Sequence, residues 1–71
     1  MSAPRLSGPL TAREHEIAQL VARGLCNKLI AREAGISEGV VKLHLHRIYR
    51  KTGVAGRTQL AVFVVTPRQP A

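Results

Sequence analysis

The stretch ISEGVVKLHLHRIYRKTG, residues 36–53, decides the fold because it has the pattern of one amphipathic helix. Ser37 can cap the N-terminus of this helix, since a serine oxygen accepts a hydrogen bond from a free amide of the first turn. Gly53 can end it in the left-handed conformation that glycine adopts without penalty. At roughly 100° per residue, the side chains divide into two stripes. The core-facing stripe consists of Val41, Leu45, Ile48 and Thr52, and the outward stripe consists of Gly39, Lys42, Leu43, His46 and Arg50.

Length and composition favour one small helical domain. A chain of 71 residues is near the lower limit for a core that folds unaided, and it buries only about 60% of its unfolded surface. Such a chain has little room for a deep catalytic cleft, so we expect no enzyme. With one Phe, one Tyr and no Trp, the core must consist of Leu, Ile, Val and Ala. These residues suit packed helices better than a β-sandwich.

The charge of the chain is strongly positive and unevenly distributed. Eleven Lys and Arg against four acids give a net charge of +7, and all four acids lie in the first 38 residues. A basic surface of this kind indicates a polyanionic partner such as nucleic acid, although a solvated basic face is the simpler alternative. The basic residues after Glu38 are Lys42, Arg47, Arg50, Lys51, Arg57 and Arg68.

The cellular compartment and the cofactors are predicted mainly from features that the sequence lacks. A single cysteine, Cys26, excludes an internal disulfide and, without further thiols, a Cys-rich zinc site. We expect this cysteine to be buried or half-buried in a structural role. No segment approaches the roughly 18 apolar residues of a membrane span, and residues 1–9 lack the apolar core of a secretion signal. A cytoplasmic protein is therefore predicted, without membrane contact.

The three histidines do not form a metal site. His44 and His46 are two positions apart on the predicted helix and point in different directions. His15 is followed by Glu16, but Gln19 stands where a zinc-protease motif needs its second histidine. We predict no metal and no cofactor. His44 lies beside the apolar stripe, which favours a packed histidine with a hydrogen bond to backbone or a neighbour.

Two further helices are predicted before residue 36. The first covers residues 12–23: Thr11 and Glu14 have capping-box spacing, and Gly24 stops the helix so that Leu25 can pack back as in a Schellman motif. The second covers residues 27–34 and ends at Gly35, so that it joins the third helix through a short Gly-containing turn typical of a helix-turn-helix. The residues expected to face inward are Ile17, Leu20, Val21, Ile30, Ala31 and Ala34.

A last helix is predicted over residues 57–65. The β-branched run at 62–65 favours a strand by propensity, but the chain offers no partner strand. Leu60, Ala61 and Val64 should pack inward, whereas we expect Val62, Phe63 or Val65 to remain exposed. Residues 1–9 are interpreted as a flexible lead or linker and residues 66–71 as a tail. The predicted fold class is all-α, a four-helix bundle with helices at about 12–23, 27–34, 38–52 and 57–65.

Five segments of the sequence together resemble one family. They are LTARE at 10–14, GLCNKLIA at 24–31, ISEGVVKLH at 36–44, IYRKTGV at 48–54 and RTQL at 57–60. They are similar to the LuxR/FixJ-type (NarL-type) helix-turn-helix, in register over residues 10–65. The resemblance implies a DNA-binding domain whose second and third helices form the helix-turn-helix and whose fourth helix contacts a second copy. It also implies a regulator of the response-regulator or quorum-sensing type.

Four positions depart from the family pattern. Cys26 replaces a Ser or Pro, which should weaken the N-cap of the second helix, and Leu29 stands where Glu is common. Val40 replaces a Thr whose hydroxyl would suit a phosphate or cap bond. Thr52 replaces a core Leu and should cost some packing.

The site expected from this resemblance lies on the helix at 38–52. We predict base contacts in the major groove of double-stranded DNA from Lys42, Leu43 and His46, since lysine can donate to guanine and leucine can meet a thymine methyl. Phosphate contacts set position and affinity. The residues predicted for them are Asn27, Lys28, Ser37, Arg47, Arg50 and Arg57. A homodimer is predicted through Val62, Phe63 and Val65, and RNA polymerase is a further candidate partner.

Two alternative functions stay open from the sequence. A sigma-factor region-four-like module would read a promoter within RNA polymerase, and the segment at 37–42 suits it. His44 and the ending with a fourth helix disfavour it. A basic helical bundle that binds an acidic protein would select no DNA motif. Selection from a random-sequence pool separates these readings.

Overall fold

The computed structural model describes residues 10–66, which form four helices joined by short turns. The helices are α1 (Ala12–Ala22), α2 (Asn27–Ala34), α3 (Glu38–Thr52) and α4 (Arg57–Val65). No strand occurs within this range, so the predicted all-α class is confirmed, and α4 is helical despite its β-branched run. The predicted lead at 1–9 lies outside the described residues, as does the predicted tail apart from Thr66.

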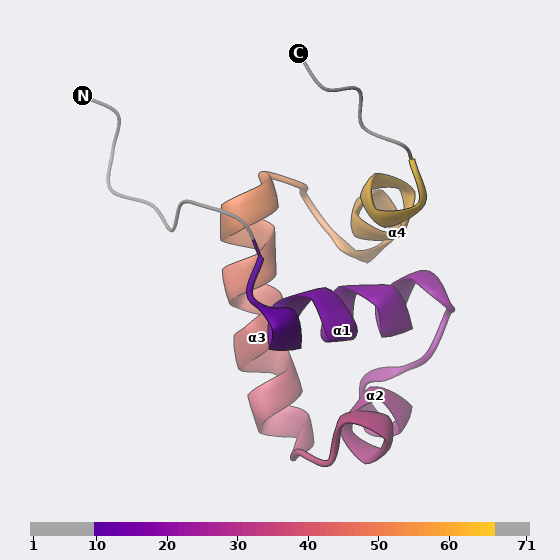
Figure 1. The fold of residues 1–71 in the computed structure, drawn as a ribbon, viewed down its shortest axis with the longest axis vertical. Coiled ribbons are helices and arrows are strands. Elements are labelled where there is room, and N and C mark those ends of the chain that lie inside the picture. The colour runs from indigo at the N-terminus through magenta and orange to yellow at the C-terminus, as the bar shows by residue number, and fades with distance from the viewer. Residues whose placement is uncertain (1–9, 67–71) are drawn as a thin grey trace, which may run out of the picture.

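The arrangement of the helices leaves one side of α3 uncovered. Figure 1 shows α3 along the long axis of the molecule with α1 crossing it, while α2 and α4 lie on opposite sides of α1. α1 is the central element: it packs against each of the other three helices, and most closely against α4. α2 and α3 pack against each other as the two helices of the helix-turn-helix.

One apolar core holds the four helices together. The residues of α1 that were predicted to face inward are all buried. The core-facing stripe of α3 is buried as well, except for Thr52, which is half-buried. The Thr52 hydroxyl donates to the Ile48 carbonyl at 2.8 Å, so the polar atom at this position is satisfied within its own helix. The buried core consists of Ile17, Ala18, Leu20, Val21, Ile30, Ala31, Val41, Leu45, Ile48 and Leu60.

The helix ends form as the local sequence predicts. The capping box at α1 is complete: the Thr11 N–H donates to Glu14 Oε1 at 2.9 Å, and the Glu14 N–H donates to Thr11 Oγ1 at 3.1 Å. Gly24 has a φ of 87°, and the Leu25 N–H donates to the Leu20 carbonyl at 3.3 Å, which is the Schellman bond. α3 begins where the Val40 N–H donates to Ser37 Oγ at 3.2 Å. These short-range contacts fix where α1 and α3 begin.

A buried ion pair joins the start of α1 to the end of α3. Lys51 Nζ donates to Glu14 Oε1 at 2.7 Å, and Glu14 is 3% exposed. Burial raises the pKa of the Glu14 carboxyl, but the hydrogen bonds from Lys51 and Thr11 and the positive charge of Lys51 lower it more. The net pKa lies below the ordinary value, so Glu14 and Lys51 pair as ions near neutral pH.

Three expectations about single side chains need correction or refinement. Cys26 is exposed rather than buried, because it occupies the extended N-cap position of α2, where it makes no cap hydrogen bond. His44 is half-buried as predicted, but its Nδ1 is buried without a hydrogen-bond partner. Phe63 is half-buried and packs against the core, whereas Val62 and Val65 are 57% and 67% exposed. α4 therefore presents two exposed valines.

Candidate nucleic-acid interface

The outward face of α3 carries exposed polar and apolar side chains in one row. Burial of Val41 and Ile48 against the core fixes the rotation of the helix about its axis. The same rotation turns the three predicted base-contact residues outward, and all three are exposed. Leu43 is 52% exposed, so its side chain is open to contact from outside. The exposed residues on this face are Lys42, Leu43, His46, Arg47 and Arg50.

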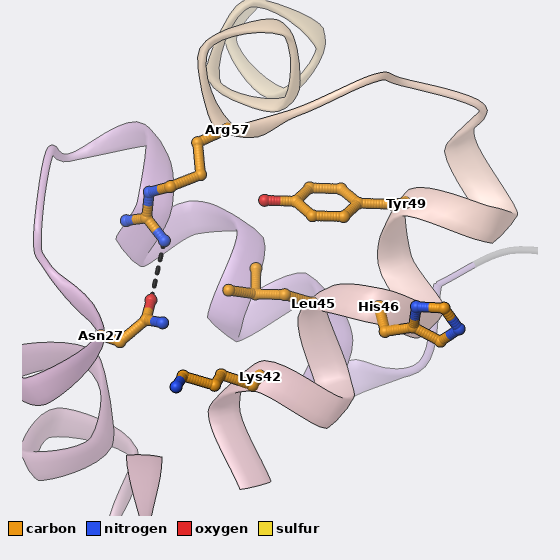
Figure 2. Close-up of a pocket in the computed structure, with 6 residues that line it drawn as sticks. All are labelled: Asn27, Lys42, Leu45, His46, Tyr49 and Arg57. Atoms are coloured by element: carbon orange, nitrogen blue, oxygen red, sulfur yellow. Dashed lines mark hydrogen bonds between the residues drawn. The ribbon is translucent and has the colours of Figure 1, made fainter. Parts of the chain in front are cut away.

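A shallow depression of about 280 Å³ lies beside this face, where α2, α3 and the start of α4 meet. Figure 2 shows Lys42, Leu45 and Tyr49 extending from α3 toward Asn27 and Arg57, while His46 turns away from them. The charged side chains of this depression are two cations, and no carboxylate lines it. The residues that line it are Asn27, Lys42, Leu45, His46, Tyr49 and Arg57. We call this set the cationic depression.

Arg57 closes one side of the cationic depression and reaches the start of α2. Its Nη1 donates to Asn27 Oδ1 at 2.8 Å, and its Nη2 donates to the Leu25 carbonyl at 2.6 Å. The sequence predicted phosphate contacts from Asn27, Ser37 and Arg57. The structure brings Arg57 and Asn27 together, whereas Ser37 Oγ caps α3 and does not line this depression.

The start of α2 is a second positive feature. Asn27 is half-buried, Lys28 is exposed, and the first turn contains no acidic residue. Cys26 provides no side-chain acceptor, so free amide groups remain at the positive end of the helix dipole. Amides of this kind bind phosphate readily. Leu29, which replaces a common Glu, is 44% exposed and adds no negative charge here.

Two lining residues were missed by the sequence reasoning. Tyr49 lies three positions after His46, and Leu45 lies three positions after Lys42, so helical spacing places both on the edge of the outward stripe. Leu45 was assigned to the core-facing stripe, and it also lines the depression. Val40, at the start of α3, is 38% exposed and has no hydroxyl to offer a phosphate.

The described residues contain neither a cluster of metal ligands nor a membrane-spanning helix. Between residues 10 and 66, no three His, Cys, Asp or Glu side chains gather as metal ligands would. Over the same range, none of the helices has the length and apolar character to cross a membrane.

The four helices, with α2 and α3 packed against each other and one face of α3 exposed, have the arrangement of a helix-turn-helix domain. The family described as bacterial regulatory proteins, luxR family, matches residues 8–64, and the chain belongs to this family. The family is one of DNA-binding transcription regulators rather than enzymes. This membership agrees with the predicted resemblance and favours it over a sigma-factor module.

Relatives from three bacteria support the same class. The chain is 44% identical over 63 residues to an uncharacterized transcriptional regulatory protein, YxjL, of Bacillus subtilis, covering 89% of this chain and 29% of that protein. It is 53% identical over 51 residues to the monoamine regulon transcriptional regulator of Klebsiella aerogenes, covering 72% and 22%. It is 44% identical over 55 residues to the nitrate/nitrite response regulator NarL of Escherichia coli, covering 78% and 26%. The chain thus spans less than a third of these relatives.

Proposed function

We propose that this chain is the sequence-specific DNA-binding domain of a bacterial transcription regulator and that it inserts α3 into the major groove. The observation that carries the proposal is the row of exposed side chains on α3. This row lies beside the cationic depression, which no carboxylate lines. An α-helix fits the major groove, where each base pair presents a distinct pattern of donors and acceptors. We also infer that the protein acts in the cytoplasm, where bacterial DNA lies.

The exposed row divides into base and phosphate contacts. Lys42 can donate to guanine O6 and N7, Leu43 can meet a thymine methyl, and His46 can donate to a base. The positively charged or polar groups around them are assigned to phosphates, which position the helix without reading sequence. These phosphate contacts are Asn27, Lys28, Ser37, Arg47 and Arg50. Arg57 was predicted among them as well, and its guanidinium also donates to Asn27 and to the Leu25 carbonyl.

Dimerisation through α4 completes the proposal. Val62 and Val65 are the most exposed large apolar residues of the described chain, and covering them in a second copy would remove them from water. Phe63 supports the same surface from the half-buried side. A two-fold dimer would bind paired half-sites about one helical turn apart. In a longer protein this domain would be the output of a response regulator or a quorum-type regulator, with RNA polymerase as a further partner.

The test is selection of duplexes from a random-sequence pool by the 71-residue chain, followed by binding at several salt concentrations. The proposal expects an enriched motif repeated at one-turn spacing and a steep fall of affinity with salt. Enrichment of a single half-site would contradict the proposed dimer but would still support sequence-specific DNA binding. Binding without any enriched motif would overturn sequence-specific recognition, and binding only in the presence of polymerase core would favour the promoter-reading alternative.

A further inference from the structure

The hydrogen bonds of Arg57 form a clamp between α4 and the helix-turn-helix. Arg57 is the first residue of α4, and its two acceptors lie 30 and 32 positions earlier in the chain, at the start of α2. Both contacts are short, and the side chain is half-buried. Since α4 packs chiefly on α1, these bonds connect α4 to an element beyond its main packing partner.

The bond to Asn27 decides which way the carboxamide of Asn27 faces. A carboxamide has one acceptor oxygen and one NH₂ donor group. Because Arg57 Nη1 donates to Oδ1, the oxygen is turned to Arg57 and the NH₂ group is left to donate elsewhere (Figure 2). An NH₂ group can donate to a phosphate, whereas an oxygen in its place would repel one. Arg57 therefore sets the donor character of Asn27.

The bond to Leu25 holds the turn that precedes α2. The Leu25 carbonyl lies in the connection between α1 and α2, and Cys26 supplies no side-chain cap there. Arg57 Nη2, which belongs to α4, donates to this carbonyl oxygen at 2.6 Å. A lysine has a single nitrogen at its end and cannot bond to both acceptors in the same fork geometry.

We propose that Arg57 is a positioning residue for DNA binding, which acts by orienting Asn27 and the turn before α2 rather than by contacting a phosphate. This inference rests on the proposed function, because it concerns how the DNA-facing residues are held. It predicts that DNA affinity depends on the two hydrogen bonds of the guanidinium, whereas a phosphate contact would depend on the positive charge. Lysine keeps the charge but loses the fork, so one substitution separates the two roles.

The experiment compares Arg57→Lys and Arg57→Ala in the 71-residue chain, using the duplex enriched by selection at several salt concentrations. Positioning predicts that Arg57→Lys loses about tenfold in affinity, nearly as much as Arg57→Ala, since a bond to a charged group is lost in both. The slope of log K against log salt should stay within half a unit of the wild type. A loss under about twofold for Arg57→Lys, with a slope about 0.9 shallower for Arg57→Ala, would show a phosphate contact and overturn the inference.

Arg13→Lys is the matched control for a purely structural effect. Arg13 Nη1 donates to the Ala34 carbonyl at 2.7 Å, so this variant also alters an arginine–carbonyl contact to α2, but at the far end of that helix. We expect Arg13→Lys to keep wild-type affinity when binding is corrected for the folded fraction. An equal loss in both variants would mean that Arg57 only stabilises the fold, and the inference would fall.

Asn27→Ala provides a second route if Arg57→Lys does not fold. This variant keeps the bond from Arg57 to Leu25 and removes only the oriented carboxamide. Positioning predicts that Asn27→Ala loses about tenfold and that adding Arg57→Ala costs less than about threefold more, because the two residues act together. Fully additive losses would overturn the inference. Absence of DNA binding by the wild-type chain would instead reject the proposed function itself.

Discussion

Lys42 and Lys51 lie on the same helix and are held in opposite ways. Lys51, near the end of α3, donates to the buried Glu14 carboxylate at 2.7 Å, so its charge is neutralised inside the fold. Lys42, near the start of α3, is exposed beside Arg57 in a depression without a carboxylate. A surface count of positive charge would treat the two lysines alike. Their surroundings assign Lys51 to stability and leave the charge of Lys42 for a polyanion.

Removing the partner of Lys51 should give the largest effect on stability. Glu14→Ala removes the buried carboxylate to which Lys51 donates and also breaks the capping box of α1. We expect a loss of about 3 kcal/mol in the free energy of unfolding, measured by urea denaturation. The matched control is Glu16→Ala, which removes an exposed carboxylate paired with Arg13 and should cost less than about 1 kcal/mol. Similar losses in the two variants would contradict the structural role given to Lys51.

Removing Lys42 should change recognition and leave stability nearly unchanged. Lys42→Ala is expected to reduce discrimination between the selected duplex and single-base variants by about 1–3 kcal/mol at one base pair. Lys28→Ala, an exposed phosphate candidate on α2, should weaken all duplexes alike and flatten the salt slope by about 0.9. Competition binding with a panel of substituted duplexes measures both. A uniform loss for Lys42→Ala would reassign Lys42 to a phosphate.

The ion pair of Lys51 also predicts an acid dependence. The folded pKa of Glu14 lies below its unfolded value, so its contribution to stability is complete above the ordinary pKa of about 4.3 and is lost as pH falls through the folded pKa. We expect the free energy of unfolding of the wild type to fall between about pH 5 and pH 3. Glu14→Gln should show a weaker fall over the same range, because the titrating group is gone. If the stability of the wild type and of Glu14→Gln fell in parallel with pH, the acid dependence could not be assigned to Glu14.

The smallest effect is expected at the uncapped start of α2. Cys26 already has the extended backbone of an N-cap residue, with φ −77° and ψ 166°, but makes no cap bond. Cys26→Ser should supply a hydroxyl acceptor and stabilise the fold by about 0.5–1 kcal/mol. Cys26→Ala, which lacks the acceptor, serves as the control and should bring no gain. Thermal unfolding distinguishes them, and equal melting temperatures would show that the cap is not formed.

The parts of the fold that depend on local pattern were predictable from the sequence. The capping box of Thr11 and Glu14, the Schellman end at Gly24 and the stripe of Val41, Leu45 and Ile48 each involve residues a few positions apart. Their geometry follows from helix periodicity and from the few conformations that end a helix. The rotation of α3, and with it the outward row, was therefore predictable as well.

The contacts that distinguish the two ends of α3 were not predictable from local pattern. Glu14 and Lys51 are 37 positions apart, and Arg57 and Asn27 are 30 apart, so only the packed helices bring them together. The prediction for Cys26 was wrong because the general tendency of cysteine to be buried is outweighed here by its N-cap position. At His44, the prediction of packing holds, but its Nδ1 has no partner in the structure.

The central claim is that α3 reads DNA sequence, and the affinity ratio between the selected duplex and a scrambled duplex of equal composition tests it most directly. Measured at physiological salt, the ratio should reach about 10³, as expected for specific recognition. Lys42→Ala should lower the ratio, while Lys28→Ala should leave it nearly unchanged. Equal affinity for the two duplexes would contradict the claim and leave only nonspecific attraction to phosphate.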